Sequence, residues 1–322
     1  MTNESRALWF EGPGRCMLRS EALPAEAGGE ATVRTLFSGI SRGTESLVFE
    51  GRVPESEYER MRAPHQAGRF PFPVKYGYAA VGVVEAGPDS LVGRPVFCLH
   101  PHQDRFRVPS GSVHTLPEDL PPERAVLAAN METALNIIWD ARIQPGDRVA
   151  VFGAGVVGLM VAYLASRIIG TETMVCDIIE DRLEAARILG VRFTLPDSVP
   201  EDCDVLINAS ASDVALAAAL DHAGCEARIV EASWYGGQSA QIPLGGAFHA
   251  RRLSIVSSQV GTLPPDHRPR WNAGRRMAKT LQLLADGKLD CLISGETAFQ
   301  TLADDYARII GSPATLCHRI RF

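Results

Sequence analysis

The sequence predicts a two-domain α/β protein, in which a β-rich first part precedes a doubly wound parallel sheet. The chain has 322 residues, which is more than one compact core normally holds. Roughly the first 125 residues alternate short apolar stretches with Gly and Pro, a texture typical of strands and turns. Beyond them, apolar strands without alternating polarity are separated by helical segments. This pattern indicates a parallel sheet covered on both faces.

The composition excludes several classes of protein. Apolar residues make up 46% of the chain and charged residues 22%, which is ordinary for a globular protein. The net charge of −6 provides no basic excess for binding nucleic acid. No apolar run is long enough to cross a membrane, and residues 1–20 contain no signal-peptide core, so we expect a cytoplasmic protein without membrane partners. The seven scattered cysteines form no C-x-x-C pair, which argues against disulfides and structural zinc.

In the first part, the stretches 31–37, 79–85 and 94–99 are predicted strands. The segment 52–69 differs because it is polar and rich in arginine. Its guanidinium groups could receive an anionic substrate. The interspersed glutamates instead favour a solvated surface loop or short helix.

The second part is predicted to alternate helices and strands. A helix over 123–141 precedes the turn Gln144-Pro145-Gly146-Asp147. Strands are expected at 148–152, 173–176, 204–207, 227–232 and 253–258, and helices at 156–169, 181–189, 214–220 and 275–285. The last predicted strand, 315–322, has the composition of the first part and is expected to return to it.

A glycine-rich motif follows the strand at 148–152 and begins the next helix. It reads Gly153-Ala154-Gly155-Val156-Val157-Gly158, a G-x-G-x-x-G pattern in the context that a dinucleotide fingerprint requires. Gly153 permits a tight turn, Gly155 lets the backbone approach a pyrophosphate, and Gly158 lets helix and strand pack closely. The helix N-terminus offers free N–H groups to the phosphates. The motif, Val156 and Val157 included, is therefore predicted to bind a dinucleotide.

An acidic residue at the end of the next strand indicates which dinucleotide binds. Asp177 lies 19 residues after Gly158. A carboxylate there accepts hydrogen bonds from the adenosine ribose hydroxyls and repels a 2′-phosphate, so we predict NAD rather than NADP. Arg182 is a further cofactor candidate, although at a helix start it can equally be an exposed charge.

These residues and their surroundings resemble the medium-chain dehydrogenase/reductase superfamily along nearly the whole chain. Gly77, Gly82, Gly87 and Gly93 are similar to the glycines of its P-x-x-x-G-H-E-x-x-G-x-V-x-x-x-G stretch. The superfamily's T-A segment is matched by Thr133-Ala134-Leu135, and its entry into the Rossmann fold is matched by QPGDRVAVFGAGVVG. Its late helix end is matched by the segment 284–289.

The resemblance implies a GroES-like catalytic domain over 1–125, completed by about 270–322, and a Rossmann NAD-binding domain over 126–269. It also implies active-site chemistry in a cleft between the domains, a small-molecule substrate, and a homodimer joined along the Rossmann sheet. The run S-G-I-S-x-G-T-E followed by G-Y resembles the bacteriochlorophyllide a dehydrogenase branch locally, without indicating that substrate.

The zinc-ligand positions of the superfamily are changed in this sequence. Zinc-dependent members have cysteines where this chain has Ser38 and Ser41, with one residue inserted. The zinc-binding histidine falls on Tyr78, and the third ligand, four residues before Thr133, falls on Ala129. Zinc prefers thiolate, imidazole and carboxylate ligands, so we expect a zinc-independent member without a catalytic metal.

Without zinc, hydrogen-bond donors and a general acid or base must handle the hydroxyl proton. The resemblance places polar candidates at the active site: Thr44, Glu45, Tyr78, His102 and Glu132. Thr44 matches the residue that touches the substrate hydroxyl, and His102 is a candidate acid or base because histidine as a residue type suits proton transfer near neutral pH. Packing is the structural alternative for Tyr78, and a helix-surface position is the alternative for Glu132.

Three further roles depend on which residues lie close together in the fold, which the sequence alone does not determine. Thr133 and Ser210 are assigned to the cofactor, because the chain at Thr133 is expected to pass the nicotinamide. Lys75 could lower the pKa of Tyr78, although a solvated surface lysine is the simpler interpretation. His100 and His102 would share one face of a strand and could form an improvised metal site with Glu132, against the commoner case of polar loop histidines.

The leading hypothesis is an NAD-dependent oxidoreductase that transfers a hydride between nicotinamide and an alcohol or carbonyl substrate. One alternative is an NAD(P)H-dependent enone or quinone reductase, against which Asp177 counts because such enzymes usually prefer NADPH. Another is a nicotinamide-binding sensor without turnover, against which the number of polar groups at the predicted cleft counts. The substrate and the reaction direction stay open.

Overall fold

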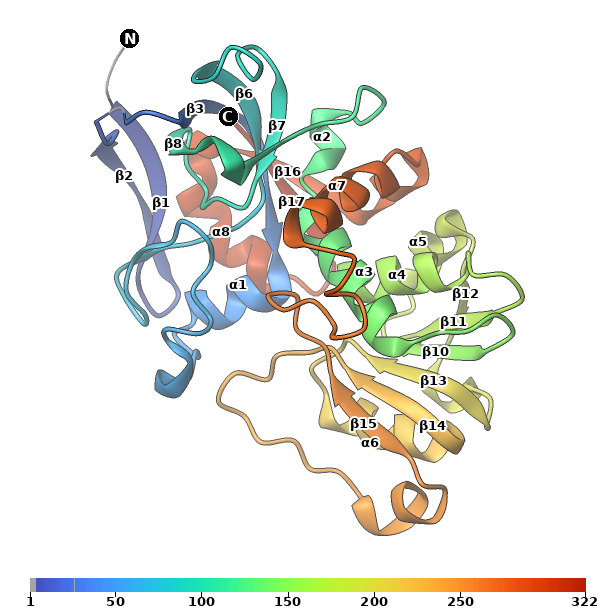
Figure 1. Cartoon of the computed structure of the whole chain (residues 1–322). Helices are drawn as coiled ribbons and strands as arrows, with labels where there is room; N and C mark the ends of the chain where they lie inside the picture. Colours follow the sequence, from blue (N-terminus) through green and yellow to red (C-terminus); the bar gives the residue numbers. More distant parts are fainter. Residues whose placement is uncertain (1–3, 26) are drawn as a thin grey trace. The chain divides into compact units, whose positions relative to one another are not determined.

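A computed structural model describes residues 4–25 and 27–322 (Figure 1). Residues 1–3 and 26, which fall in the predicted first domain, lie outside the described residues. The chain forms two compact units, Met1–Ala129 with Met277–Phe322 and Asn130–Arg276. The boundaries fall inside helices α3 (Ala128–Ala141) and α7 (Ala273–Leu283). None of the described helices is long and apolar enough to cross a membrane.

The first unit is built on two mostly antiparallel sheets. The smaller has the order β2-β1-β5-β4 and contains β1 (Glu4–Gly12), β2 (Arg15–Ala22), β4 (Ala67–Gly68) and β5 (Val74–Lys75). The larger has the order β16-β17-β3-β6-β7-β9, with β8 paired to β3. Its strands are β3 (Glu30–Ser41), β6 (Ala80–Ala86), β7 (Pro95–Cys98), β8 (Arg105–Pro109), β9 (Val113–Thr115), β16 (Ile293–Ala298) and β17 (Cys317–Arg321).

The C-terminal segment completes this larger sheet, as predicted. Strand β17 pairs antiparallel with β3, from Cys317 opposite Ser41 to Arg321 opposite Phe37. The predicted strand at 31–37 lies within β3. The predicted strands at 79–85 and 94–99 overlap β6 and β7, respectively. The helices of this unit include α1 (Arg42–Phe49), α2 (Pro122–Ala125) and α8 (Leu302–Gly311).

The arginine-rich segment 52–69 is largely loop, with a short 3₁₀ helix at Glu55–Glu57. Its Arg52 and Arg60 are exposed and pair with Glu50 at 2.6 Å and Glu57 at 2.9 Å. The segment therefore has the mixed-charge surface expected of a solvated loop.

The second unit is a six-stranded parallel sheet with the order β12-β11-β10-β13-β14-β15. Its elements are β10 (Arg148–Phe152), α4 (Val156–Ala165), β11 (Glu172–Cys176), α5 (Arg182–Leu189), β12 (Arg192–Thr194), β13 (Cys203–Asn208), α6 (Asp213–His222), β14 (Ala223–Glu231) and β15 (Ser254–Ser257). The chain adds strands on one side of β10 and then on the other, so the strand order reverses between β10 and β13. The predicted doubly wound sheet is confirmed.

Alternating strand residues form the core of this unit. Ala150 and Phe152 of β10, with Met174 and Cys176 of β11, share one buried cluster with Leu216 and Leu220 of α6. This spacing of two places one face of each strand against the helix. The central strand β10 is apolar and buried from Val149 to Phe152, and polar residues stand at the carboxyl ends of its neighbours, where Asp177 follows β11 and Asn208 ends β13.

Two predicted helices have different bounds. The helix predicted over 123–141 is interrupted, with α2 ending at Ala125 and α3 beginning at Ala128. The helix predicted over 156–169 ends at Ala165. There the Thr171 hydroxyl donates to the carbonyls of Ala165 at 2.8 Å and Ile168 at 3.0 Å. A side chain beyond the helix thus satisfies carbonyls that another turn would have used.

Candidate functional site

The glycine-rich motif forms the turn between β10 and α4. Gly153 has φ of +101°, and a Cβ atom there would lie 2.9 Å from the Ser210 backbone. A Cβ atom on Gly158 would lie 1.9 Å from the Gly153 carbonyl oxygen. A Cβ atom on Gly155 would meet no described heavy atom within 4 Å. The two outer glycines therefore allow close packing, and the middle one borders open space.

The start of helix α4 lies beside this open space. Gly155 is the N-cap residue, and no side chain of the described part of the chain caps the helix. The first N–H groups of a helix have no partner within it and carry partial positive charge. An uncapped helix start next to open space fits the pyrophosphate of a dinucleotide.

Asp177 follows β11 and is held against the glycine turn. Its Oδ2 accepts the N–H of Ala154 at 2.6 Å, and its Oδ1 accepts the N–H of Ile179 at 2.9 Å. Each carboxylate oxygen has a second lone-pair position for a ribose hydroxyl. The neighbouring Ile178 is 82% exposed and offers an apolar surface that an adenine ring could cover. The sequence analysis missed Ile178.

The other predicted cofactor residues lie in different environments. The Ser210 hydroxyl donates to Asn208 Oδ1 at 2.6 Å, and its backbone borders Gly153. Val156 is buried, and Val157 and Thr133 are partly exposed. Arg182 is only 5% exposed, so its interpretation as an exposed charge is wrong. The long apolar stem of an arginine side chain is compatible with such burial.

A polar cluster that the sequence analysis missed lies at the carboxyl ends of β13 and β14. Asn208 Nδ2 donates to Glu231 Oε2 at 2.7 Å and to the Tyr235 hydroxyl at 3.0 Å. The Ser233 N–H donates to Glu231 Oε1 at 2.8 Å. Burial raises the pKa of Glu231, and the hydrogen bonds from Ser233, Asn208 and Tyr235 oppose that increase. The available signal was a polar residue ending an otherwise apolar strand, as Asn208 does in β13.

In the first unit, Glu45 and His102 form a buried pair. The His102 Nε2–H donates to Glu45 Oε2 at 2.9 Å, and both side chains are 0% exposed. His102 Nδ1 contacts the Ser38 hydroxyl at 2.7 Å, so both ring nitrogens have partners. Glu45 also accepts the Ser41 N–H at 2.8 Å and the Tyr306 hydroxyl at 2.6 Å. These contacts give both residues a structural role, and any catalytic role would act through their neighbours.

Tyr78 lies in a second cluster, with Ser41 and Thr44. Its hydroxyl hydrogen-bonds the side chains of both residues, and its ring is only partly buried. Burial, followed by the nearby Glu45 carboxylate, raises the pKa of Tyr78, and the two hydrogen bonds oppose this. The phenol is therefore neutral at physiological pH. A neutral phenol can donate a hydrogen bond to a carbonyl oxygen but is a poor base.

Two interpretations of the charged candidates need correction. Lys75 is not a solvated lysine, because it is buried and its Nζ donates to Glu21 at 2.7 Å and Gln103 at 2.9 Å. Glu132 is not a helix-surface glutamate, because it is buried and pairs with Arg276 at 3.0 Å. In both cases, a partner distant in sequence satisfies the buried charge.

The alternative metal site also gains no support. His100 is buried and stacks on Phe106, with ring centroids 3.8 Å apart, while His102 bonds Ser38 and Glu45. Glu132 belongs to the second unit and pairs with Arg276. Among the described residues, no group of three or more His, Cys, Asp or Glu side chains could hold a metal ion.

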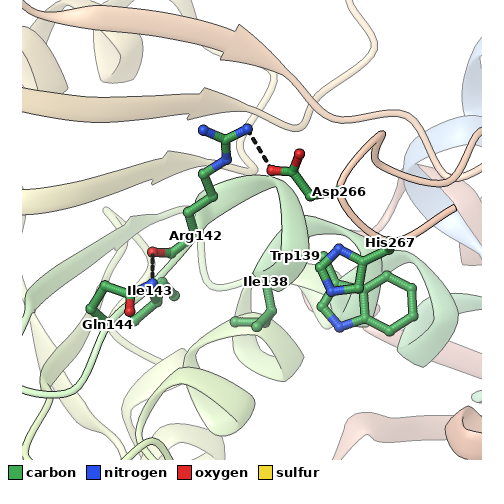
Figure 2. A pocket seen from close by; sticks show the side chains of 7 residues that line it. All are labelled: Ile138, Trp139, Arg142, Ile143, Gln144, Asp266 and His267. Atoms are coloured by element: carbon green, nitrogen blue, oxygen red, sulfur yellow. Dashed lines mark hydrogen bonds and ion pairs between the residues drawn. The ribbon is translucent and has the colours of Figure 1, made fainter. Parts of the chain in front are cut away.

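A separate pocket of about 400 Å³ lies near the end of α3 (Figure 2). Figure 2 shows the rings of Trp139 and His267 stacked, with centroids 4.4 Å apart, and the Arg142–Asp266 ion pair at 2.7 Å. Arg142 begins the loop that enters β10, whereas the glycine turn leaves that strand at its other end. The pocket is therefore distinct from the candidate cofactor site.

The two units have the folds of a GroES-like domain and a Rossmann domain. A solved structure of RspB from Escherichia coli CFT073, described as an alcohol dehydrogenase complexed with NADH, superposes with a TM-score of 0.78 at 18% identity, over 100% of both chains. No family model matches the chain.

Several curated relatives carry dehydrogenase names. The D-guloside 3-dehydrogenase of Escherichia coli K12 is 24% identical over 87% of this chain and 89% of its own length. An uncharacterized zinc-type alcohol dehydrogenase-like protein of Haemophilus influenzae is 22% identical over 73% of this chain and 78% of its own. These names support the dehydrogenase resemblance, but they support neither the zinc-independent subtype nor the bacteriochlorophyllide branch.

Proposed function

We propose that this chain is an NAD-dependent oxidoreductase that transfers a hydride between nicotinamide and an alcohol or carbonyl substrate. The observation that carries the proposal is the glycine turn, where open space at Gly155 meets the uncapped start of α4. The cofactor bound there would accept the hydride as NAD⁺ or supply it as NADH. The dehydrogenase names of relatives that match most of the chain support the same reaction class. The small-molecule substrate and the homodimer stay predictions.

The preference for NAD over NADP rests on Asp177. Its carboxylate is anchored to the turn by the Ala154 N–H, so a 2′-phosphate would be brought towards a fixed negative charge. We expect calorimetric titration to give NAD an affinity at least about tenfold higher than NADP, because one close like-charge pair costs at least ~1.4 kcal/mol. Asp177→Asn should reduce this preference. Tighter binding of NADP to the unaltered protein would contradict the assignment.

The zinc-free part of the proposal rests on side-chain chemistry. At the positions that the resemblance indicates for zinc ligands, the Ser38 hydroxyl contacts His102 Nδ1 at 2.7 Å, and the side chains of Ser41 and Tyr78 hydrogen-bond each other. Ala129 has no side-chain donor atom. Neutral hydroxyls are poor zinc ligands beside the thiolates and imidazoles that zinc prefers. We infer that the Tyr78 phenol, held by Ser41 and Thr44, polarises the substrate carbonyl. Elemental analysis that found one zinc per chain would contradict the zinc-free part.

The role of Tyr78 can be tested with Tyr78→Phe, which removes only the hydroxyl. We expect kcat for carbonyl reduction to fall by about 10²-fold, the usual loss when a positioned proton donor is removed. The Kd for NADH should not change. Because the pKa of Tyr78 is raised, the unaltered enzyme should keep this donor protonated up to about pH 10.

Tyr58→Phe is the matched control, because Tyr58 lies in the surface segment and packs on Phe70. The screen for a substrate begins with glycosides, which the name of the D-guloside relative suggests. Equal kcat values for Tyr78→Phe and the unaltered enzyme would exclude Tyr78 as the donor. Tight NAD binding without turnover of any substrate would instead favour the sensor alternative.

A further inference from the structure

The second unit holds a carboxylate that the proposed function does not yet use. Glu231 ends β14, and Asn208 and Tyr235 bond its Oε2 while the Ser233 N–H bonds its Oε1. Asn208 is buried, whereas Glu231 and Tyr235 are partly exposed. Three hydrogen bonds thus hold the carboxylate, while the residue keeps some exposure to solvent.

The strand register places Glu231 relative to the glycine turn. Phe152, the last residue of β10, pairs with Cys176 on one side and with Asn208 on the other. Asn208 in turn pairs with Glu231. Asp177 follows Cys176 directly, so Asp177 and Glu231 lie on opposite sides of β10.

This arrangement assigns the two halves of a dinucleotide to different strands. Such a ligand lies across the point where the strand order reverses, with its pyrophosphate at the glycine turn and its adenosine ribose at the acidic residue. If Asp177 takes the adenosine ribose, the nicotinamide half extends over β13 and β14. Glu231 then lies at the nicotinamide end.

The groups that bond the Glu231 carboxylate within the described chain are all uncharged. Asn208 and the Ser233 N–H carry no charge, and burial raises the pKa of Tyr235 so that its phenol stays neutral. Hydrogen bonds fix the carboxylate without neutralising it. The oxidised nicotinamide ring carries a positive charge and the reduced ring carries none, so a nearby carboxylate attracts only the oxidised form.

We propose that Glu231 makes this cofactor site prefer NAD⁺ over NADH, with Asn208 and Tyr235 holding its carboxylate at the nicotinamide end. The inference rests on the proposed function, because it requires a dinucleotide at the glycine turn. Removing the charge should lower the affinity for NAD⁺ about fivefold relative to NADH, as expected for charges several ångströms apart near a protein surface. The affinity for ADP-ribose, which lacks the nicotinamide ring, should not change.

The experiment measures Kd for NAD⁺, NADH and ADP-ribose with the full-length protein and three variants. Glu231→Gln removes the charge and keeps an acceptor oxygen. Glu231→Asp keeps the charge and should retain a ratio of the two affinities close to that of the unaltered protein. Glu226→Gln is the matched control, because Glu226 lies on the same strand, is exposed and pairs with Arg252.

The outcomes separate this inference from the proposed function. A selective loss of NAD⁺ affinity in Glu231→Gln, restored in Glu231→Asp and absent in Glu226→Gln, would support the inference. An unchanged ratio of NAD⁺ to NADH affinity, or an equal loss for ADP-ribose, would overturn it while leaving the proposed function intact. If the unaltered protein bound none of the three ligands, the proposed function would fail and this inference with it.

Discussion

Replacement of Gly158 by alanine is expected to destabilise the second unit by about 3 kcal/mol and to abolish dinucleotide binding. The added Cβ would lie 1.9 Å from the Gly153 carbonyl oxygen, far inside van der Waals contact. Both groups belong to the tight turn and the helix that follows it, so no flexible side chain can move aside. Overpacking of this kind costs up to about 3 kcal/mol. Chemical denaturation of the variant measures the loss.

Gly155→Ala is the control that separates folding from binding. The residue has φ of −72°, and its Cβ would meet no described heavy atom, so the fold should lose less than about 1 kcal/mol. The same methyl group would occupy the space assigned to the pyrophosphate, and we expect the Kd for NAD to rise by at least about tenfold, which is ~1.4 kcal/mol. If Gly155→Ala bound NAD normally, the pyrophosphate would have to lie elsewhere.

This part of the molecule is predictable because its determinants are local. Gly153, Gly155 and Gly158 follow an apolar strand at fixed spacing, and each position has a steric reason that applies wherever such a turn forms. The alternation of apolar strands and helices likewise predicts the doubly wound sheet. Local spacing therefore predicts the fold and the position of the candidate cofactor site.

The environments of charged residues could not be predicted in the same way. Lys75 is buried because Glu21 and Gln103, distant in the sequence, supply its partners. Glu231 and Asn208 come together only because β13 and β14 are neighbours in register. Such contacts depend on strand order and pairing, which the periodicity of one segment does not encode.

The buried pair of Glu45 and His102 shows the same limit for the candidate catalytic residues. They lie 57 residues apart, and Tyr306, a third partner, comes from α8 near the end of the chain. The family resemblance suggests Glu45 and His102 as polar candidates for proton transfer. In the structure, hydrogen bonds to buried neighbours occupy both side chains. Their contribution to stability can therefore be measured directly.

Removal of the Glu45 carboxylate is expected to destabilise the first unit by about 4 kcal/mol. The side chain accepts hydrogen bonds from the Ser41 N–H, His102 Nε2 and the Tyr306 hydroxyl in a region without solvent. Glu45→Ala would leave three buried donors without an acceptor and create a cavity, and breaking such networks costs about 3–5 kcal/mol. The midpoint of urea unfolding of the first unit measures the effect.

Tyr306→Phe provides the matched comparison, because it removes one hydrogen bond and leaves Glu45 with its other donors. It should cost about 1.5–3 kcal/mol, the range for a hydrogen bond to a charged group. A structural Glu45 predicts that the loss of stability follows the number of hydrogen bonds to its carboxylate that each variant removes, while turnover of the folded fraction changes much less. If Glu45→Ala cost less than about 1 kcal/mol and kcat nevertheless fell by 10²-fold or more, Glu45 would have to act directly in proton transfer.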